Sequence, residues 1–86
     1  MDWAKYGHVI ASDYRRRIVL CLMKSPKTPK QISEETTLYL SHVSHVINEL
    51  MKKGVVRCLT PKLRRGKLFS LSDDGEEIAK QLQKLG

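Results

Sequence analysis

The segment TPKQISEETTLYLSHVSHVINELMKKG, residues 28–54, contains two consecutive helix patterns. Thr28 suits an N-cap, Pro29 the first helical position, and Gln31 the position that closes a capping box. Ile32 is the one apolar residue before a polar run, so we expect a helix of about two turns. A helix this short must be stabilised by packing against the rest of the chain.

A second helix is predicted over about residues 41–53, because its apolar residues recur at the i, i+3, i+4, i+7 spacing of a single buried stripe. Gly54 then supplies the left-handed residue that commonly follows a helix. The stripe consists of Val43, Val46, Ile47 and Leu50. The opposite face consists of Ser41, His42, His45, Asn48, Glu49 and Lys52. Two helices with a tight turn and a polar second helix indicate a helix-turn-helix, which places its recognition helix in the DNA major groove.

Charge is unevenly distributed along the chain. The 86 residues contain 16 Lys and Arg and 9 Asp and Glu, for a net charge of +7. Residues 52–67 contain cations and no acid, whereas residues 73–77 are mostly acidic. A basic stripe of this kind is typical of a protein that binds a polyanion. The length predicts a single domain over residues 1–86, without a separate catalytic or ligand-binding lobe.

A basic hairpin is predicted directly after the recognition helix. Residues 55–59 and 68–71 are apolar or β-branched and indicate two strands, and Pro61 and Gly66 favour a loop between them. We expect this loop, about residues 60–67, to form a wing that contacts the DNA backbone or minor groove. An ordinary solvated hairpin would not explain four cations without a counter-charge. They are Lys62, Arg64, Arg65 and Lys67.

Three further helices are expected. Residues 1–11 have aromatic and aliphatic residues at helical spacing, and these could pack in the domain's own core or against a second copy. Ser12 caps a helix from Asp13, in which Arg15–Arg17 point in successive directions and so favour ion pairs or a solvated face. Ser72 caps a final helix that begins with acids, as the helix dipole prefers, and has a buried stripe of Ile78, Leu82 and Leu85.

No catalytic or metal-binding motif is apparent. Cys21 and Cys58 lie in apolar runs and are predicted to be buried, reduced thiols. His42 and His45 alone would make an incomplete metal site. Gly-rich phosphate loops and nucleophile elbows are absent, so we expect no enzyme activity and no cofactor. We also expect a cytoplasmic protein, because no signal peptide or membrane-length apolar run is present.

The order of these elements resembles the small archaeal and bacterial winged helix-turn-helix transcriptional regulators of the MarR and ArsR type, with the resemblance covering residues 10–82. The matching strings are Ala11–Ile18, Thr28–Ile32, Leu40–His45, Glu49-Leu50 with Lys53–Val56, Arg65–Lys67, and Leu71-Ser72 with Gly75. The resemblance implies a mainly α fold with a small β-hairpin: a three-helix core, a two-stranded wing and a C-terminal helix.

The resemblance also implies roles for individual residues. Thr28 and Lys30 would approach the DNA backbone, and Arg64, Arg65 and Lys67 of the wing would bind the flanking duplex. The resemblance implies that Ser41, His42 and His45 would face bases or phosphates. From the polar face of the helix we expect these three residues and Asn48 to read bases. The chain departs from the family pattern in two places, because Tyr39 replaces a capping Ser and His45 replaces a common Arg.

Most relatives bind double-stranded DNA as dimers, so a homodimer is expected here, and no small-molecule effector is predicted. The residues expected at the dimer seam are Trp3, Tyr6, Ile78, Leu82 and Leu85. The alternative is a winged-helix protein-interaction module within a larger assembly. The four wing cations argue against this alternative, whereas Tyr39 and Leu40 would suit it.

Overall fold

Five helices and one antiparallel pair of strands make up the part of the chain that the computed structural model describes, residues 1–85, with Leu85 described by its backbone only. The elements are α1 (Trp3–Ile10), α2 (Asp13–Lys24), α3 (Pro29–Thr36), α4 (Leu40–Lys52), β1 (Val56–Cys58), β2 (Phe69–Leu71) and α5 (Asp73–Leu85). The predicted winged helix-turn-helix fold is confirmed.

Most of the helices begin at a side-chain cap. Thr28 and Gln31 form the predicted capping box at the start of α3, with N–O distances of 3.2 and 2.9 Å. Ser12 accepts a hydrogen bond from the Arg15 backbone, and Ser72 accepts one from Gly75. The start of α4 differs, because Tyr39 makes no side-chain cap hydrogen bond. These starts are determined locally, within one turn of the chain.

The turn between α3 and α4 is held from several sides. Thr37 adopts a left-handed conformation with φ of 59°, which is uncommon for a β-branched residue. The Arg17 guanidinium donates to the carbonyl of Thr36, and the Ser33 hydroxyl donates to the carbonyl of Leu38 at 2.6 Å. Leu38 is itself buried. These contacts fix the angle at which α4 leaves α3.

The wing is tied to the helices by a third backbone segment. Strands β1 and β2 pair antiparallel in the register Val56 to Leu71 and Cys58 to Phe69. Lys27, in the link before α3, exchanges two backbone hydrogen bonds with Phe69, of 3.0 and 2.9 Å. Both strands are shorter than predicted. At the loop end one hydrogen bond of 2.8 Å, from the Leu59 N–H to the Leu68 carbonyl, follows the paired residues, and at the other end the Val55 N–H donates to the carbonyl of Leu50 in α4.

The core combines the predicted apolar stripes into one cluster. Its members come from all five helices and both strands. They include Val9, Ile18, Ile32, Val43, Ile47, Leu50, Val55, Phe69, Leu71, Ile78 and Leu82. Ile78 and Leu82 were expected at a dimer seam, but they lie in this chain's own core because α5 packs against α2.

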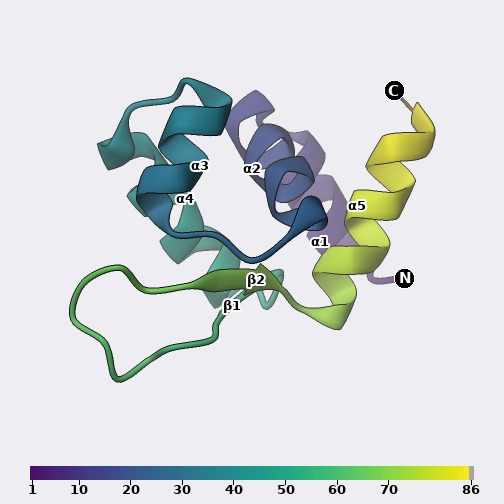
Figure 1. Cartoon of the computed structure of the whole chain (residues 1–86). Helices are drawn as coiled ribbons and strands as arrows, with labels where there is room; N and C mark the ends of the chain where they lie inside the picture. The colour runs from purple at the N-terminus through teal and green to yellow at the C-terminus, as the bar shows by residue number, and fades with distance from the viewer. Residues whose placement is uncertain (86) are drawn as a thin grey trace.

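The wing and α5 lie on different sides of the molecule. In Figure 1 the loop between β1 and β2 projects to the left, beneath α3 and α4, whereas α5 and both chain termini lie on the right. The basic loop is therefore separated from the acidic start of α5, although the two are close in sequence.

Substitution of glycine by alanine should have opposite effects on stability at two helical positions, Gly7 and Gly75. A Cβ at Gly7 would meet nothing within 4 Å, so Gly7→Ala should stabilise the protein by about 0.5–1 kcal/mol through helix propensity. A Cβ at Gly75 would lie 2.1 Å from the carbonyl oxygen of Val55, so Gly75→Ala should destabilise it by roughly 1–3 kcal/mol. Chemical denaturation of both variants tests this packing, and a stabilising Gly75→Ala would contradict it.

Candidate nucleic-acid interface

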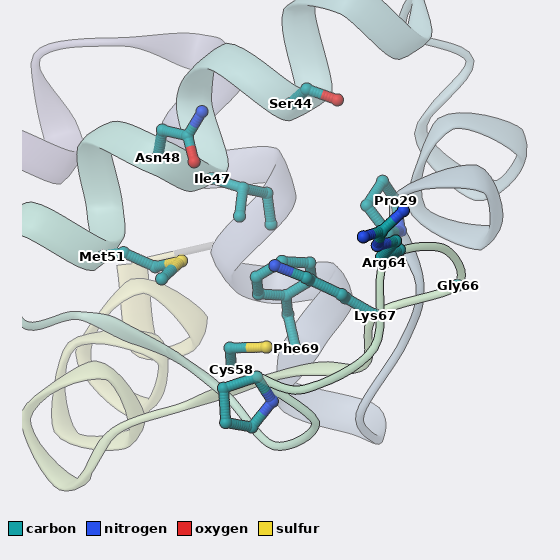
Figure 2. Close-up of a pocket in the computed structure, with 11 residues that line it drawn as sticks. Pro29, Ser44, Ile47, Asn48, Met51, Cys58, Arg64, Gly66, Lys67 and Phe69 are labelled. Atoms are coloured by element: carbon teal, nitrogen blue, oxygen red, sulfur yellow. The ribbon is translucent and has the colours of Figure 1, made fainter.

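A hollow of about 330 Å³ lies between α4 and the wing. Its rim includes Ser44 and Asn48 from α4 and Arg64 and Lys67 from the wing. Figure 2 shows the Lys67 side chain extending from the wing toward α4. The recognition helix and the basic loop therefore border one continuous surface, as a joint grip on a duplex requires.

Part of the lining of this hollow is apolar. Ile47 and Phe69 are buried core residues, and Cys58 and Met51 lie beside them (Figure 2). Because Phe69 also pairs with Lys27, the base of the wing cannot shift without disturbing the start of α3. The core thus holds the base of the wing against α4 and the start of α3.

The predicted residues of α4 occupy different flanks of the helix. Ser41, His42 and His45 are exposed, as is Asn48, but only Asn48 lines the hollow beside the wing. The His42 ring lies against Tyr14 of α2, with ring centroids 5.3 Å apart. His45 Nε2 lies 3.9 Å from a Glu49 carboxylate oxygen.

The remaining predicted residues lie at the start of α3 and on the wing. Thr28 is committed to capping α3, whereas Lys30 is exposed in its first turn. Lys62 and Arg65 are exposed on the loop, outside the residues that line the hollow. The side chain of Leu85, expected at the dimer seam, lies outside the described part of the chain.

The salt bridges between the described side chains lie outside the wing loop. Glu35 lies near Lys27, Glu49 bonds to Arg15, and Asp74 bonds to Lys5 at 2.6 Å. Asp13 pairs with both Arg16 and Arg17, as expected for that arginine run. Among residues 1–84, whose side chains are described, none of these salt bridges involves a wing cation. The wing cations therefore have no acidic partner among the described side chains.

A network around Arg15 anchors α4 to the first two helices. Its guanidinium donates to the carbonyl of His8 at 2.9 Å and to Glu49 at 3.1 Å. The hydrogen bond from Arg15 holds the pKa of Glu49 below its ordinary value. Burial lowers the pKa of His8, and the positive charges of Arg15 and Lys53 lower it further. The folded protein thus favours a neutral His8 and an ionised Glu49.

Sequence reasoning missed three kinds of residue at this interface. Ser44 and Met51 line the hollow, and they lie one turn before and after Asn48 on one flank of α4, so helical spacing from Asn48 could have found them. Tyr14 contacts α4 across a large sequence separation, which no local pattern reveals. The buried ammonium of Lys27, which donates to the carbonyl of Cys21 at 2.9 Å, was also unexpected.

The two thiols differ in their surroundings. Both cysteines are free, and Cys21 is buried as predicted, which raises the pKa of its thiol. Cys58 is only half-buried, because it borders the hollow under the wing. Within the described residues, no three His, Cys, Asp or Glu side chains are grouped as a metal would require. No described helix has the length and apolar character needed to cross a membrane.

The fold and the paired surfaces of α4 and the wing define the winged helix-turn-helix class. The chain belongs to the arsR family of bacterial regulatory proteins, whose family model matches residues 12–57. This confirms the resemblance inferred from the sequence strings. A search of curated proteins found no match.

Solved structures share the fold at low sequence identity. RV1404 from Mycobacterium tuberculosis aligns with a TM-score of 0.77 and 19% identity, over 94% of this chain and 60% of that one. The adhesin competence repressor AdcR from Streptococcus pyogenes aligns with a TM-score of 0.79 and 16% identity, over 86% of this chain and 56% of that one. The MarR family transcriptional regulator SPO1453 from Silicibacter pomeroyi aligns with a TM-score of 0.77 and 17% identity, over 93% of this chain and 60% of that one. The chain thus spans less than two thirds of each of these proteins.

The neutral state of His8 predicts a pH dependence of stability. Below the ordinary pKa of 6.5 the unfolded chain takes up a proton that the folded chain resists, so the free energy of unfolding should decrease as the pH falls through this range. The decrease should be a fraction of the ~1.4 kcal/mol per pH unit that one full proton represents. Chemical denaturation of wild type and His8→Gln between about pH 5 and 7.5 measures the slope of the free energy of unfolding against pH. A His8→Gln variant with the wild-type slope would contradict this assignment.

Proposed function

We propose that this chain is a sequence-specific transcriptional regulator that binds double-stranded DNA through α4 and the wing. Its membership of the arsR family of bacterial regulatory proteins supports regulation. The observation that carries the mode of binding is the shared hollow, in which Asn48 of α4 and Arg64 and Lys67 of the wing border the same surface. The proposed activity is binding, without a catalytic step.

In this proposal the wing supplies most of the affinity. Lys62, Arg64, Arg65 and Lys67 neutralise phosphates along the duplex, aided by Lys30 at the start of α3. Phosphate contacts of this kind release counterions and act on every sequence alike. The lack of acidic partners for the wing cations among the described side chains supports this role.

The exposed face of α4 supplies the sequence preference. Ser41, His42, His45 and Asn48 present hydroxyl, imidazole and amide groups that can form hydrogen bonds with base edges. Thr28 acts indirectly, because its side chain is used to cap α3 and so to position Lys30. The uncapped start of α4 also leaves backbone N–H groups available to a phosphate.

A homodimer remains part of the proposal, with a seam different from the one first expected. Trp3 is 64% exposed, and Ile10 and Leu20 are exposed beside a hollow of about 450 Å³ between α1, α2 and α5. Tyr6 and the edge of Leu82 also line this hollow. A second copy seated there would cover these apolar groups and present two recognition helices to one duplex.

Removing two wing cations should weaken binding to every duplex. For Arg64→Ala/Arg65→Ala, each lost phosphate contact should reduce the slope of log K against log salt by about 0.9, or about 1.8 for both. Fluorescence anisotropy over a salt series measures this slope. The matched control is Lys80→Ala/Lys84→Ala, which removes two exposed cations from α5, on the opposite side from the wing in Figure 1. Equal slopes for the two double variants would contradict a specific role for the wing.

Removing the amide of Asn48 should alter specificity more than general affinity. Asn48→Ala should lose roughly 1–3 kcal/mol of discrimination at one base pair if the amide contacts a base. Lys30→Ala should instead weaken all duplexes by a similar factor. Binding of both variants to a panel of single-base-pair changes in a selected duplex separates the two effects. Unaltered preference in Asn48→Ala would exclude Asn48 from the base-reading residues.

A further inference from the structure

Three aromatic rings connect α2 to the start of α4. Tyr14 and His42 lie with ring centroids 5.3 Å apart and planes inclined by 31°. His42 and Tyr39 lie 5.8 Å apart at 80°, an edge-to-face arrangement. Aromatic rings attract one another at these separations. The Tyr39 ring is therefore held in place by its neighbours although it is 78% exposed.

Leu40 adds a second exposed apolar side chain beside Tyr39. It is the first residue of α4 and is 51% exposed. Neither residue belongs to the core cluster, and Tyr39 makes no cap hydrogen bond. Packing in the core therefore does not account for these two large apolar side chains. We call Tyr39 and Leu40, with the supporting rings of His42 and Tyr14, the aromatic edge.

We propose that the aromatic edge contacts thymine methyl groups in the major groove, and so makes this chain select T at particular operator positions. The inference rests on the proposed function. The thymine methyl is the apolar feature among the base edges of the major groove, and apolar side chains are its usual partners. In helix-turn-helix proteins the N-terminal residues of the recognition helix approach those edges. Tyr39 and Leu40 directly precede Ser41, the first polar residue of the proposed reading face.

The surroundings of the edge favour DNA over a protein partner. A stable protein interface needs about 800 Å² and 20–30 residues on each side, with an apolar centre. The aromatic edge offers four side chains and merges into the polar face of Ser41 and His45. A small apolar edge beside polar donors matches the floor of a DNA groove, where methyl groups alternate with hydrogen-bonding atoms.

Packing against His42, which lies on Tyr14, reduces the side-chain entropy that Tyr39 loses when it contacts DNA. A free tyrosine would lose rotational freedom on binding, whereas a ring already packed against its neighbour loses less. Tyr14 is thus a positioning residue, which acts on the DNA through His42 and Tyr39. Its removal should reduce the selection of methyl groups without abolishing it.

The test replaces single thymines by deoxyuridine, which removes the methyl group and leaves base pairing intact. Duplexes are first selected from a random pool with the wild-type chain, and each T is then changed in turn. Loss of one buried methyl, about 0.8 kcal/mol, corresponds to about fourfold weaker binding. We expect this loss at one or more positions for wild type. Tyr39→Ala/Leu40→Ala should bind the T and U duplexes equally, and Tyr14→Ala should show an intermediate ratio.

The control is Leu63→Ala, which removes an exposed leucine from the wing. A wing on the backbone or in the minor groove cannot sense a methyl group that lies in the major groove, so this variant should keep the wild-type T to U ratio. Thermal unfolding confirms that the variants remain folded, as expected for exposed side chains.

Three results would overturn the inference. Equal wild-type affinity for all T and U duplexes would exclude methyl contact while leaving the proposed function intact. Unchanged DNA binding by Tyr39→Ala/Leu40→Ala would place the aromatic edge off the DNA and favour a protein partner for it. Failure of the wild-type chain to select any duplex would overturn the proposed function together with this inference.

Discussion

The two backbone hydrogen bonds between Lys27 and Phe69 are the constraint on which the interface depends. They join the segment just before α3 to the first residue of β2, across more than forty residues of chain. As a result, the helix-turn-helix and the base of the wing form one body. The Lys27 side chain adds to this, because its buried ammonium donates to the carbonyl of Cys21 and to the hydroxyl of Ser25. A buried charge is tolerated here because it is hydrogen-bonded and lies near Glu35.

Charge separation follows from the same architecture. Most of the paired acids lie on α2, α4 and α5. Asp13 pairs with Arg16 and Arg17 of its own helix, whereas Glu49 and Asp74 pair with Arg15 and Lys5 of other helices. The wing loop and α5 lie on different sides of the molecule (Figure 1). Exposed ion pairs of this type contribute little to stability. Their larger effect is on the electrostatic field, because the four cations of the wing loop stay without an acidic partner among the described side chains and can attract a polyanion.

The two flanks of α4 serve different purposes in this arrangement. One flank borders the wing through Ser44, Asn48 and Met51, and the other packs on α2 through His42 and Glu49. Arg15 links Glu49 to the end of α1, so the orientation of the recognition helix depends on the first helix as well as on α3. A proposed dimer seam at α1, α2 and α5 would therefore lie against the same helices that hold α4.

The sequence alone determined the elements of this fold, because the signals for a helix start, a buried stripe or a turn lie within a few neighbouring residues. Thr28, Pro29 and Gln31 specify the start of α3 in this way, as Gly54 specifies the end of α4. Tertiary structure alone decided that Asn48 borders the wing while His42 packs against Tyr14, that Ile78 and Leu82 are buried within the chain, and that Lys27 pairs with Phe69. These outcomes depend on the angles at which helices cross and on contacts between residues far apart in the chain. No local pattern encodes such contacts, since each becomes possible only when the whole core has formed.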